Sequence, residues 1–192
     1  MAALPFYYVY LNEGGEDQNK KEGDAVILTD TANSVNFDKN YLTTGVCMIP
    51  HRDKAYKGGE DAFSCSSDAC MFCLADGVGG WAKKGVDVAL YSRELCHGFK
   101  ELYENKKDDE KVDQKKFLVE ATKLAKSKHV GSSTFVSMVI DKDKASIEGL
   151  NLGDSGYIIY RDGKVLFHTP VQQWRFNAPY QCGTNHKLPF NA

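Results

Sequence analysis

The chain has 192 residues, of which 42% are hydrophobic, 11% aromatic and 26% charged, and its formal net charge is -2. These values are typical of one globular domain and lack the basic field that a nucleic-acid partner favours. The longest apolar runs fall far short of the ~20 residues that cross a bilayer, so no membrane partner is expected.

The first 42 residues are expected to form an N-terminal extension with a candidate strand at residues 26–28, and the domain proper is expected to span residues 43–192. The N-terminus lacks a targeting signal, because its first Arg is Arg52 and acidic residues come early, at Glu13, Glu16 and Asp17. We therefore expect an intracellular, cytoplasmic protein.

Apolar or alternating residues bounded by turn residues predict three strands early in the domain, at residues 43–49, 62–64 and 71–75. Apolar residues at helical spacing then predict two amphipathic helices, at about residues 86–103 and 117–129. Between the helices, residues 104–116 mix acidic and basic side chains evenly, which is typical of a solvated loop or helix face.

In the last third of the chain the apolar pattern changes to period two. It predicts four strands, at residues 134–140, 146–152, 156–160 and 164–168. Asp162 and Gly163 join the last two as a hairpin turn, because Asp-Gly tolerates positive φ. Strands followed by two helices and an antiparallel meander predict an α+β layered fold rather than a parallel βαβ sheet.

Six cysteines in a chain without a signal peptide are expected to be reduced thiols. Cys65, Cys70 and Cys73 could instead be three zinc ligands. A fourth ligand is not evident, and Cys73 lies inside an apolar run, so buried thiols are the favoured interpretation.

Three segments place carboxylates beside glycines at the ends of apolar runs. They contain Glu60 and Asp61, then Asp76 and Gly77, and finally Asp154. Carboxylate oxygens with small neighbours and room for water suit a hard cation such as Mg²⁺ or Mn²⁺. Gly77 could also turn its carbonyl to the same ion, because no Cβ stands in the way. Each segment alone is equally consistent with an ordinary turn, but their joint occurrence favours a metal site.

A dinucleotide site is a weaker alternative, because residues 77–82 fit the pattern G-x-G-x-x-A. Asp76 would then repel the pyrophosphate, and no second strand ends in an acid ~20 residues further on. A serine nucleophile is not indicated either, since residues 153–156 lack the G-x-S-x-G pattern.

The same three segments, in the same order, resemble the metal-dependent protein phosphatase family of type 2C (PPM). The resemblance covers roughly residues 45–181 and is most specific at residues 75–81, 131–134 and 151–156. The segment at residues 172–181 looks like the branch found in mitochondria and plastids, so an organelle is the alternative to the cytoplasm. The fold that the resemblance implies is a β-sandwich of two antiparallel sheets flanked by helices.

The resemblance also implies roles for the acidic residues. In the family, the acid matching Asp76 bridges two Mg²⁺ or Mn²⁺ ions. The glycine carbonyl matching Gly77 and the acid matching Glu60 serve the second ion, and the acid matching Asp61 supports metal-bound waters. The aspartate matching Asp154 lies near a weaker metal position. The expected catalytic residues are thus Asp76, Glu60 and Asp61, and no cofactor besides the metals is implied.

Two departures from the family pattern affect the expected activity. An arginine that grips phosphate is replaced by residues 55–58, and Lys57, Lys54 or Arg52 could substitute for it. The family's remaining metal aspartates lie beyond the last strand predicted here, so the C-terminal part of the domain is expected to be missing.

The expected function is that of a metal-dependent protein serine/threonine phosphatase. Such an enzyme hydrolyses phosphoserine and phosphothreonine in a protein substrate with a metal-activated water. This chain is expected to be weak or inactive. The alternative is a catalytically incompetent, phosphatase-like interaction module.

Overall fold

The computed structural model describes residues 11–12, 35–37, 40–42, 45–107, 110–141, 144 and 146–185. Contacts divide the chain into two units, one of residues 1–49 and 157–168 and the other of residues 50–156 and 169–192. The candidate strand at residues 26–28 lies outside the described residues, and the boundary expected after residue 42 stays a prediction.

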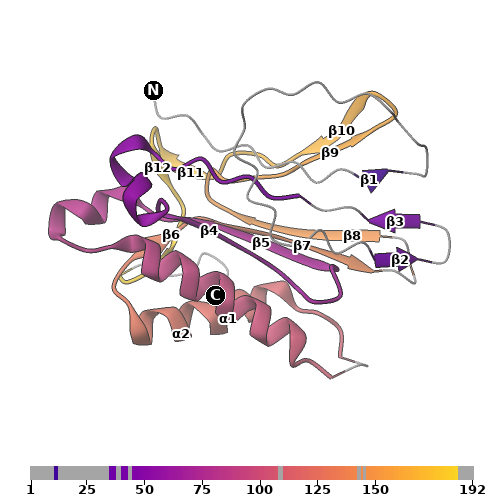
Figure 1. Ribbon diagram of the computed structural model, residues 1–192, viewed down its shortest axis with the longest axis horizontal. Coiled ribbons are helices and arrows are strands. Elements are labelled where there is room, and N and C mark those ends of the chain that lie inside the picture. Colours follow the sequence, from indigo (N-terminus) through magenta and orange to yellow (C-terminus); the bar gives the residue numbers. More distant parts are fainter. Residues whose placement is uncertain are drawn as a thin grey trace. The chain divides into compact units, whose positions relative to one another are not determined.

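The larger unit is built on a four-stranded antiparallel sheet (Figure 1). In spatial order its strands are β4 (Asp61–Cys65), β5 (Met71–Asp76), β7 (Phe135–Asp141) and β8 (Ser146–Leu152). Along β5 buried and half-buried residues alternate, so the strand presents Met71, Cys73 and Ala75 to the core. This alternation orients the rest of β5, including its last residue, Asp76.

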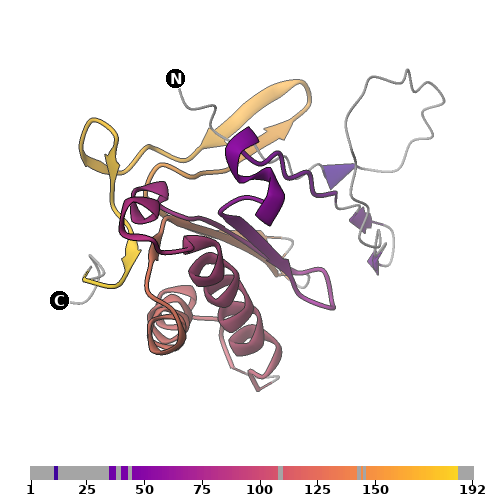
Figure 2. The same cartoon turned by 60° about the vertical axis from the view of Figure 1, so that its left-hand side comes forward.

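Two helices cover the same face of this sheet, α1 (Val88–Glu104) and α2 (Gln114–Lys128), as Figures 1 and 2 show. Each begins after an aspartate cap, since Asp87 accepts from the Ala89 N–H and Asp113 from the Lys116 N–H. Phe99 of α1 is fully buried between Phe117 of α2 and Phe135 of β7, with ring centroids 6.1 and 4.9 Å away. The apolar stripe of α1 thus ties both helices to the sheet.

Short elements complete the larger unit. Two 3-10 helices precede α1, η1 (Arg52–Lys57) and η2 (Gly79–Lys84). Strand β6 (Ser132–Ser133) pairs with β13 (Cys182–Gly183), and β11 (Gln173–Arg175) pairs with β12 (Ala178–Pro179). Sequence periodicity did not predict these elements, because strands of two or three residues and 3-10 helices of six residues are too short to show a period.

The smaller unit contains two further antiparallel arrangements. In one, β3 (Asn40–Leu42) lies between β1 (Leu11–Asn12) and β2 (Val35–Phe37). In the other, β9 (Ile158–Arg161) and β10 (Lys164–His168) form a hairpin. Its turn residues Asp162 and Gly163 have φ of 51° and 74°, which confirms the predicted hairpin turn.

The α+β class is confirmed, and so are both helices and the strands of the four-stranded sheet. The strand expected at residues 43–49 is wrong for residues 45–49, which have no regular structure. Alternation makes a strand only where a neighbouring strand supplies hydrogen bonds, and within the described residues this segment pairs with none. The sandwich of two sheets stays a prediction. No helix in the described ranges combines the length and apolar character needed to cross a membrane.

The cysteines follow the buried-thiol prediction in part. All six are free thiols, and Cys70, Cys73, Cys96 and Cys182 are buried, whereas Cys47 is exposed and Cys65 half-buried. Burial raises the pKa of Cys65 to about 11, which disfavours the thiolate that a zinc ligand requires.

Candidate metal centre

Asp61 and Asp76 face each other at one end of the sheet. Asp61 is the first residue of β4, Asp76 is the last residue of β5, and the two are paired in register. Residues directly opposite on antiparallel strands point to the same face, and like charges in that arrangement repel. The next pair, Ala62 and Ala75, is buried. The two carboxylates therefore lie on the face of the sheet away from the helices.

The electrostatics of Asp76 show that more carboxylates gather here. Burial raises the pKa of Asp76 to about 7, and the charge of Asp61, a hydrogen bond to Asp61 and the charges of Asp154 and Glu60 add to the effect. Burial also raises the pKa of Asp61. The other three acidic residues selected from the sequence are thus all close enough to act on Asp76.

Gly77 lies where no side chain fits. A Cβ there would be 2.5 Å from the backbone oxygen of Glu60, 2.6 Å from Ser92 Oγ and 3.0 Å from Val88 Cγ1. The backbone after Asp76 is therefore packed against the backbone of Glu60 and the first turns of α1. The predicted role of the Gly77 carbonyl as a metal ligand stays a prediction.

Asp154 reaches the site through a glycine turn after β8. Gly153 has φ of 106°, and a Cβ there would be 2.6 Å from both Thr134 Cγ2 and the Tyr180 backbone oxygen. Thr134 Oγ1 lies 2.6 Å from Ser155 Oγ, and the Thr134 N–H donates to the Asp76 carbonyl at 3.1 Å. Thr134 thus connects the Asp154 turn to the end of β5.

The segment of residues 131–134 supports the loop after Asp76. Ser133 Oγ donates to the Asp76 carbonyl at 2.8 Å, and Trp81 Nε1 donates to Ser132 Oγ at 2.6 Å. Ser132 Oγ in turn donates to Gln181 Oε1 at 2.6 Å. These hydrogen bonds explain why the Ser-rich segment accompanies the Asp76 segment in the sequence, which the residue pattern alone did not explain.

Glu60 is buried and paired with two lysines of η1. The Lys54 ammonium contacts Glu60 Oε2, and Lys57 Nζ lies 3.3 Å from Glu60 Oε1 and 2.7 Å from Asp87 Oδ1. The hydrogen bond from Lys57 lowers the pKa of Asp87, and the same bond raises the pKa of Lys57. The positive charge of Lys54 opposes the rise in the pKa of Asp61.

The sequence indicates Lys54 and Lys57 only as substitutes for a phosphate-binding arginine, and it does not indicate their pairing with Glu60. The pairing depends on Gly58 and Gly59, whose φ values of 79° and 84° turn the chain back over η1. Two consecutive glycines before Glu60 were the available signal.

These residues do not form a finished ligand set, but two observations indicate that they suit a divalent cation. Within the described part of the chain, no three His, Cys, Asp or Glu side chains already converge as a ligand set. Yet bound positive charge would relieve the repulsion of the other carboxylates on Asp76, and the Lys54 ammonium shows that a cation is accommodated against Glu60. Oxygen donors of this kind are those that Mg²⁺ and Mn²⁺ prefer.

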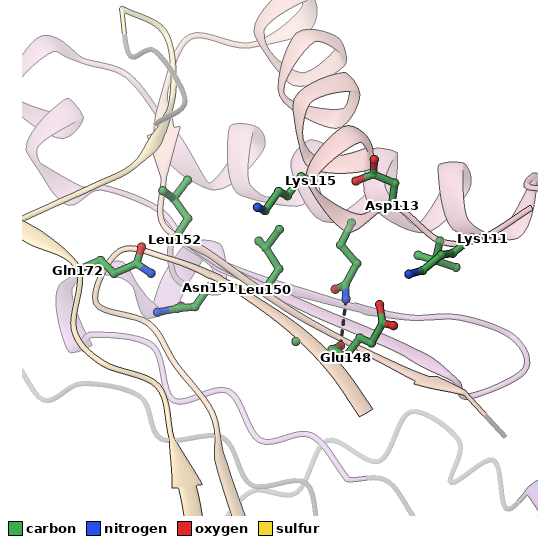
Figure 3. Close-up of a pocket in the computed structure, with 11 residues that line it drawn as sticks. Lys111, Asp113, Lys115, Glu148, Leu150, Asn151, Leu152 and Gln172 are labelled. Atoms are coloured by element: carbon green, nitrogen blue, oxygen red, sulfur yellow. Dashed lines mark hydrogen bonds between the residues drawn. The ribbon is translucent and has the colours of Figure 1, made fainter. Parts of the chain in front are cut away.

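A cavity of about 980 Å³ lies elsewhere, between the start of α2 and strand β8 (Figure 3). Its lining includes Lys111, Lys115 and Leu150, and Gln114 Nε2 donates to the Glu148 backbone oxygen at 3.0 Å. It contains none of the four acidic residues of the candidate centre.

Gly79 offers a test of the glycine loop. Its φ is not in the positive range, but a Cβ there would lie 2.8 Å from Lys54 Nζ and 3.1 Å from Glu60 Oε2. We expect Gly79→Val to cost roughly 1–3 kcal/mol of stability or to weaken Mn²⁺ binding, since the added atoms press on this ion pair. Gly80→Val is the matched control, because the nearest atom to a Cβ at Gly80 is 4.0 Å away. Equal melting temperatures and Mn²⁺ affinities for the two variants would contradict the expectation.

No family model matches the chain. It is 40% identical over 151 residues to "Probable protein phosphatase 2C 55" of Arabidopsis thaliana, covering 77% of this chain and 31% of that protein. It is also 40% identical over 140 residues to "Probable protein phosphatase 2C 80" of the same plant, with 73% and 33% covered.

A solved structure agrees with these matches. The structure described as the photosystem II phosphatase PBCP superposes with a TM-score of 0.64 at 37% identity, covering 71% of this chain and 52% of that one. The chain belongs to the type 2C protein phosphatase family. It spans about a third of the length of the two Arabidopsis relatives.

Proposed function

We propose that this chain carries the acidic metal-binding residues of a metal-dependent protein serine/threonine phosphatase. The observation that supports this most directly is the half-buried Asp76 opposite Asp61, with Glu60 and Asp154 acting on it. Membership of a family that generally depends on divalent metals supports the same proposal.

In this proposal Asp76, Glu60, Asp154 and the Gly77 carbonyl would hold Mg²⁺ or Mn²⁺, two ions being expected in a complete site. Such ions lower the pKa of a coordinated water and screen the charge of a phosphate ester. Asp61 is expected to accept hydrogen bonds from water at the site, because it is held opposite Asp76 and only partly buried. Ser133 and Thr134 keep the end of β5 in place through the Asp76 carbonyl.

The proposed substrate is a phosphorylated protein, because the matched relatives are described as protein phosphatases. Lys54 and Lys57 would supply positive charge near the phosphate, although neither can form the bidentate contact of an arginine. We propose a cytoplasmic location, with an organelle as the alternative.

We also propose that this chain by itself turns over weakly. Ligand charge and number set the affinity for hard cations, and the residues assigned here supply one bridging aspartate, one glutamate, one carbonyl and a more remote aspartate. The comparisons lend no support to the alternative of an interaction module.

Hydrolysis of p-nitrophenyl phosphate and of a phosphothreonine peptide tests the proposal, with and without Mn²⁺. We expect a low Mn²⁺-dependent rate that Asp76→Asn removes. A rate that is the same in Asp76→Asn would exclude Asp76 from the chemistry. Mn²⁺ binding without any turnover would instead favour the interaction module.

A further inference from the structure

The two lysines on Glu60 are held differently. Lys57 is 18% exposed and bridges Glu60 to Asp87, the cap of α1. Lys54 is 33% exposed, and within the described residues its side-chain partner is Glu60 alone. The Lys57 ammonium is therefore held by two carboxylates. Lys54 has one carboxylate partner and can leave Glu60 by moving its flexible side chain toward solvent.

Glu60 cannot serve both Lys54 and a divalent cation with the same oxygen. The Lys54 ammonium contacts Glu60 Oε2, and Gly79 packs so closely that a Cβ would be 2.8 Å from the ammonium and 3.1 Å from that oxygen. A second cation on Oε2 would be repelled by the Lys54 ammonium already in contact with that oxygen. A metal that binds Glu60 through Oε2 must first displace the lysine.

We propose that Lys54 is an exchangeable internal cation: it neutralises the buried Glu60 when no metal is bound and leaves Glu60 when Mg²⁺ or Mn²⁺ binds. This inference rests on the proposed function, because it takes Glu60 as a metal ligand. Lys54 would then keep Glu60, which is only 5% exposed, paired after loss of the metal, since an unpaired buried charge is strongly destabilising. Lys54 thereby lowers the apparent affinity of the centre for its own metal.

Calorimetric titration with Mn²⁺ tests the competition. We expect Lys54→Met to bind Mn²⁺ about tenfold or more tightly than the wild-type chain, because a charge-assisted hydrogen bond no longer has to be broken. Lys83→Met is the matched control: it removes the same charge from an exposed residue of η2, and its affinity should stay within about twofold of wild type. In EDTA, Lys54→Met should also melt at a lower temperature than Lys83→Met.

The outcomes separate the two proposals. Unchanged or weaker Mn²⁺ binding by Lys54→Met, with wild type binding normally, overturns the exchange and leaves the proposed metal centre standing. Failure of both wild type and Lys54→Met to bind Mn²⁺ overturns the metal centre and the exchange together. A tenfold gain that Lys83→Met does not share supports the exchange.

A measurement on the wild-type chain covers the case in which Lys54→Met does not fold. Nuclear magnetic resonance of the lysine side-chain amines during a titration with diamagnetic Mg²⁺ follows Lys54 and Lys57 separately. We expect the Lys54 signal to move to the position of a solvated lysine while Lys57 remains paired with Asp87. A Lys54 signal that stays unchanged at saturating Mg²⁺ overturns the exchange.

Discussion

Asp76→Asn should abolish measurable Mn²⁺ binding and also stabilise the protein when metal is removed. The substitution keeps the shape of the side chain but deletes the charge on which Glu60, Asp61 and Asp154 all act. A hard cation then loses the carboxylate ligand on which the other acidic residues act, and we expect its affinity to fall by about a hundredfold or more. Calorimetry on Asp76→Asn beside Asp53→Asn, which removes one charge from an exposed side chain, measures the effect.

The stabilisation follows from the sign of the pKa shift. The pKa of Asp76 is raised from 3.8 to about 7 in the folded protein, so the folded state binds the proton more tightly than the unfolded state. In EDTA the wild-type chain should therefore lose stability as the pH rises from about 4 through 7, by up to about 4 kcal/mol. Asp76→Asn cannot ionise and should lack this loss.

Urea denaturation in EDTA at pH 5 and pH 8 checks this expectation. Asp76→Asn should exceed the wild type in stability at pH 8, and the difference should shrink at pH 5. If Asp76→Asn is less stable than wild type at pH 8, the charge of the Asp76 carboxylate is stabilised by groups of the protein and not by a metal.

Gly77→Ala should strongly destabilise the protein. Its Cβ would meet the Glu60 backbone oxygen at 2.5 Å and Ser92 Oγ at 2.6 Å, both shorter than any normal contact. Ser92 can rotate its hydroxyl, but the Glu60 carbonyl is main chain, so relief requires β4 and β5 to move apart. We expect a loss of about 3 kcal/mol or more, accompanied by weaker Mn²⁺ binding.

Gly80→Ala provides the control for this change, since its Cβ would come no closer than 4.0 Å to a neighbouring atom and less backbone freedom is lost on folding. Its stability should match or slightly exceed that of wild type. Thermal melts and Mn²⁺ titrations of the two variants side by side give the answer. If Gly77→Ala and Gly80→Ala have the same melting temperature, the close packing of Gly77 on Glu60 does not exist in solution.

The sequence by itself determined the elements that depend on local periodicity or on a local turn. The residues expected in β8 and β10 match the observed bounds, and the expected range of α1 differs by one or two residues. The Asp162-Gly163 hairpin was also predictable from the sequence, because the turn needs only two residues that tolerate positive φ. Candidate acids were identified for the same reason, since each lies in a short segment that also contains glycine.

Only the tertiary structure decided which of these residues meet. The register of β4 on β5 sets Asp61 against Asp76, and the Gly153 turn carries Asp154 to within electrostatic reach from more than seventy residues away. Neither the pairing of Asp61 with Asp76 nor the approach of Asp154 produces a repeat in the sequence, so no local sequence pattern predicts them. The ion pair between Lys54 and Glu60 likewise depends on two glycines that fold η1 back on the start of β4. Long-range partners are selected by packing and hydrogen bonding across the fold, and these contacts form only once the sheet is assembled.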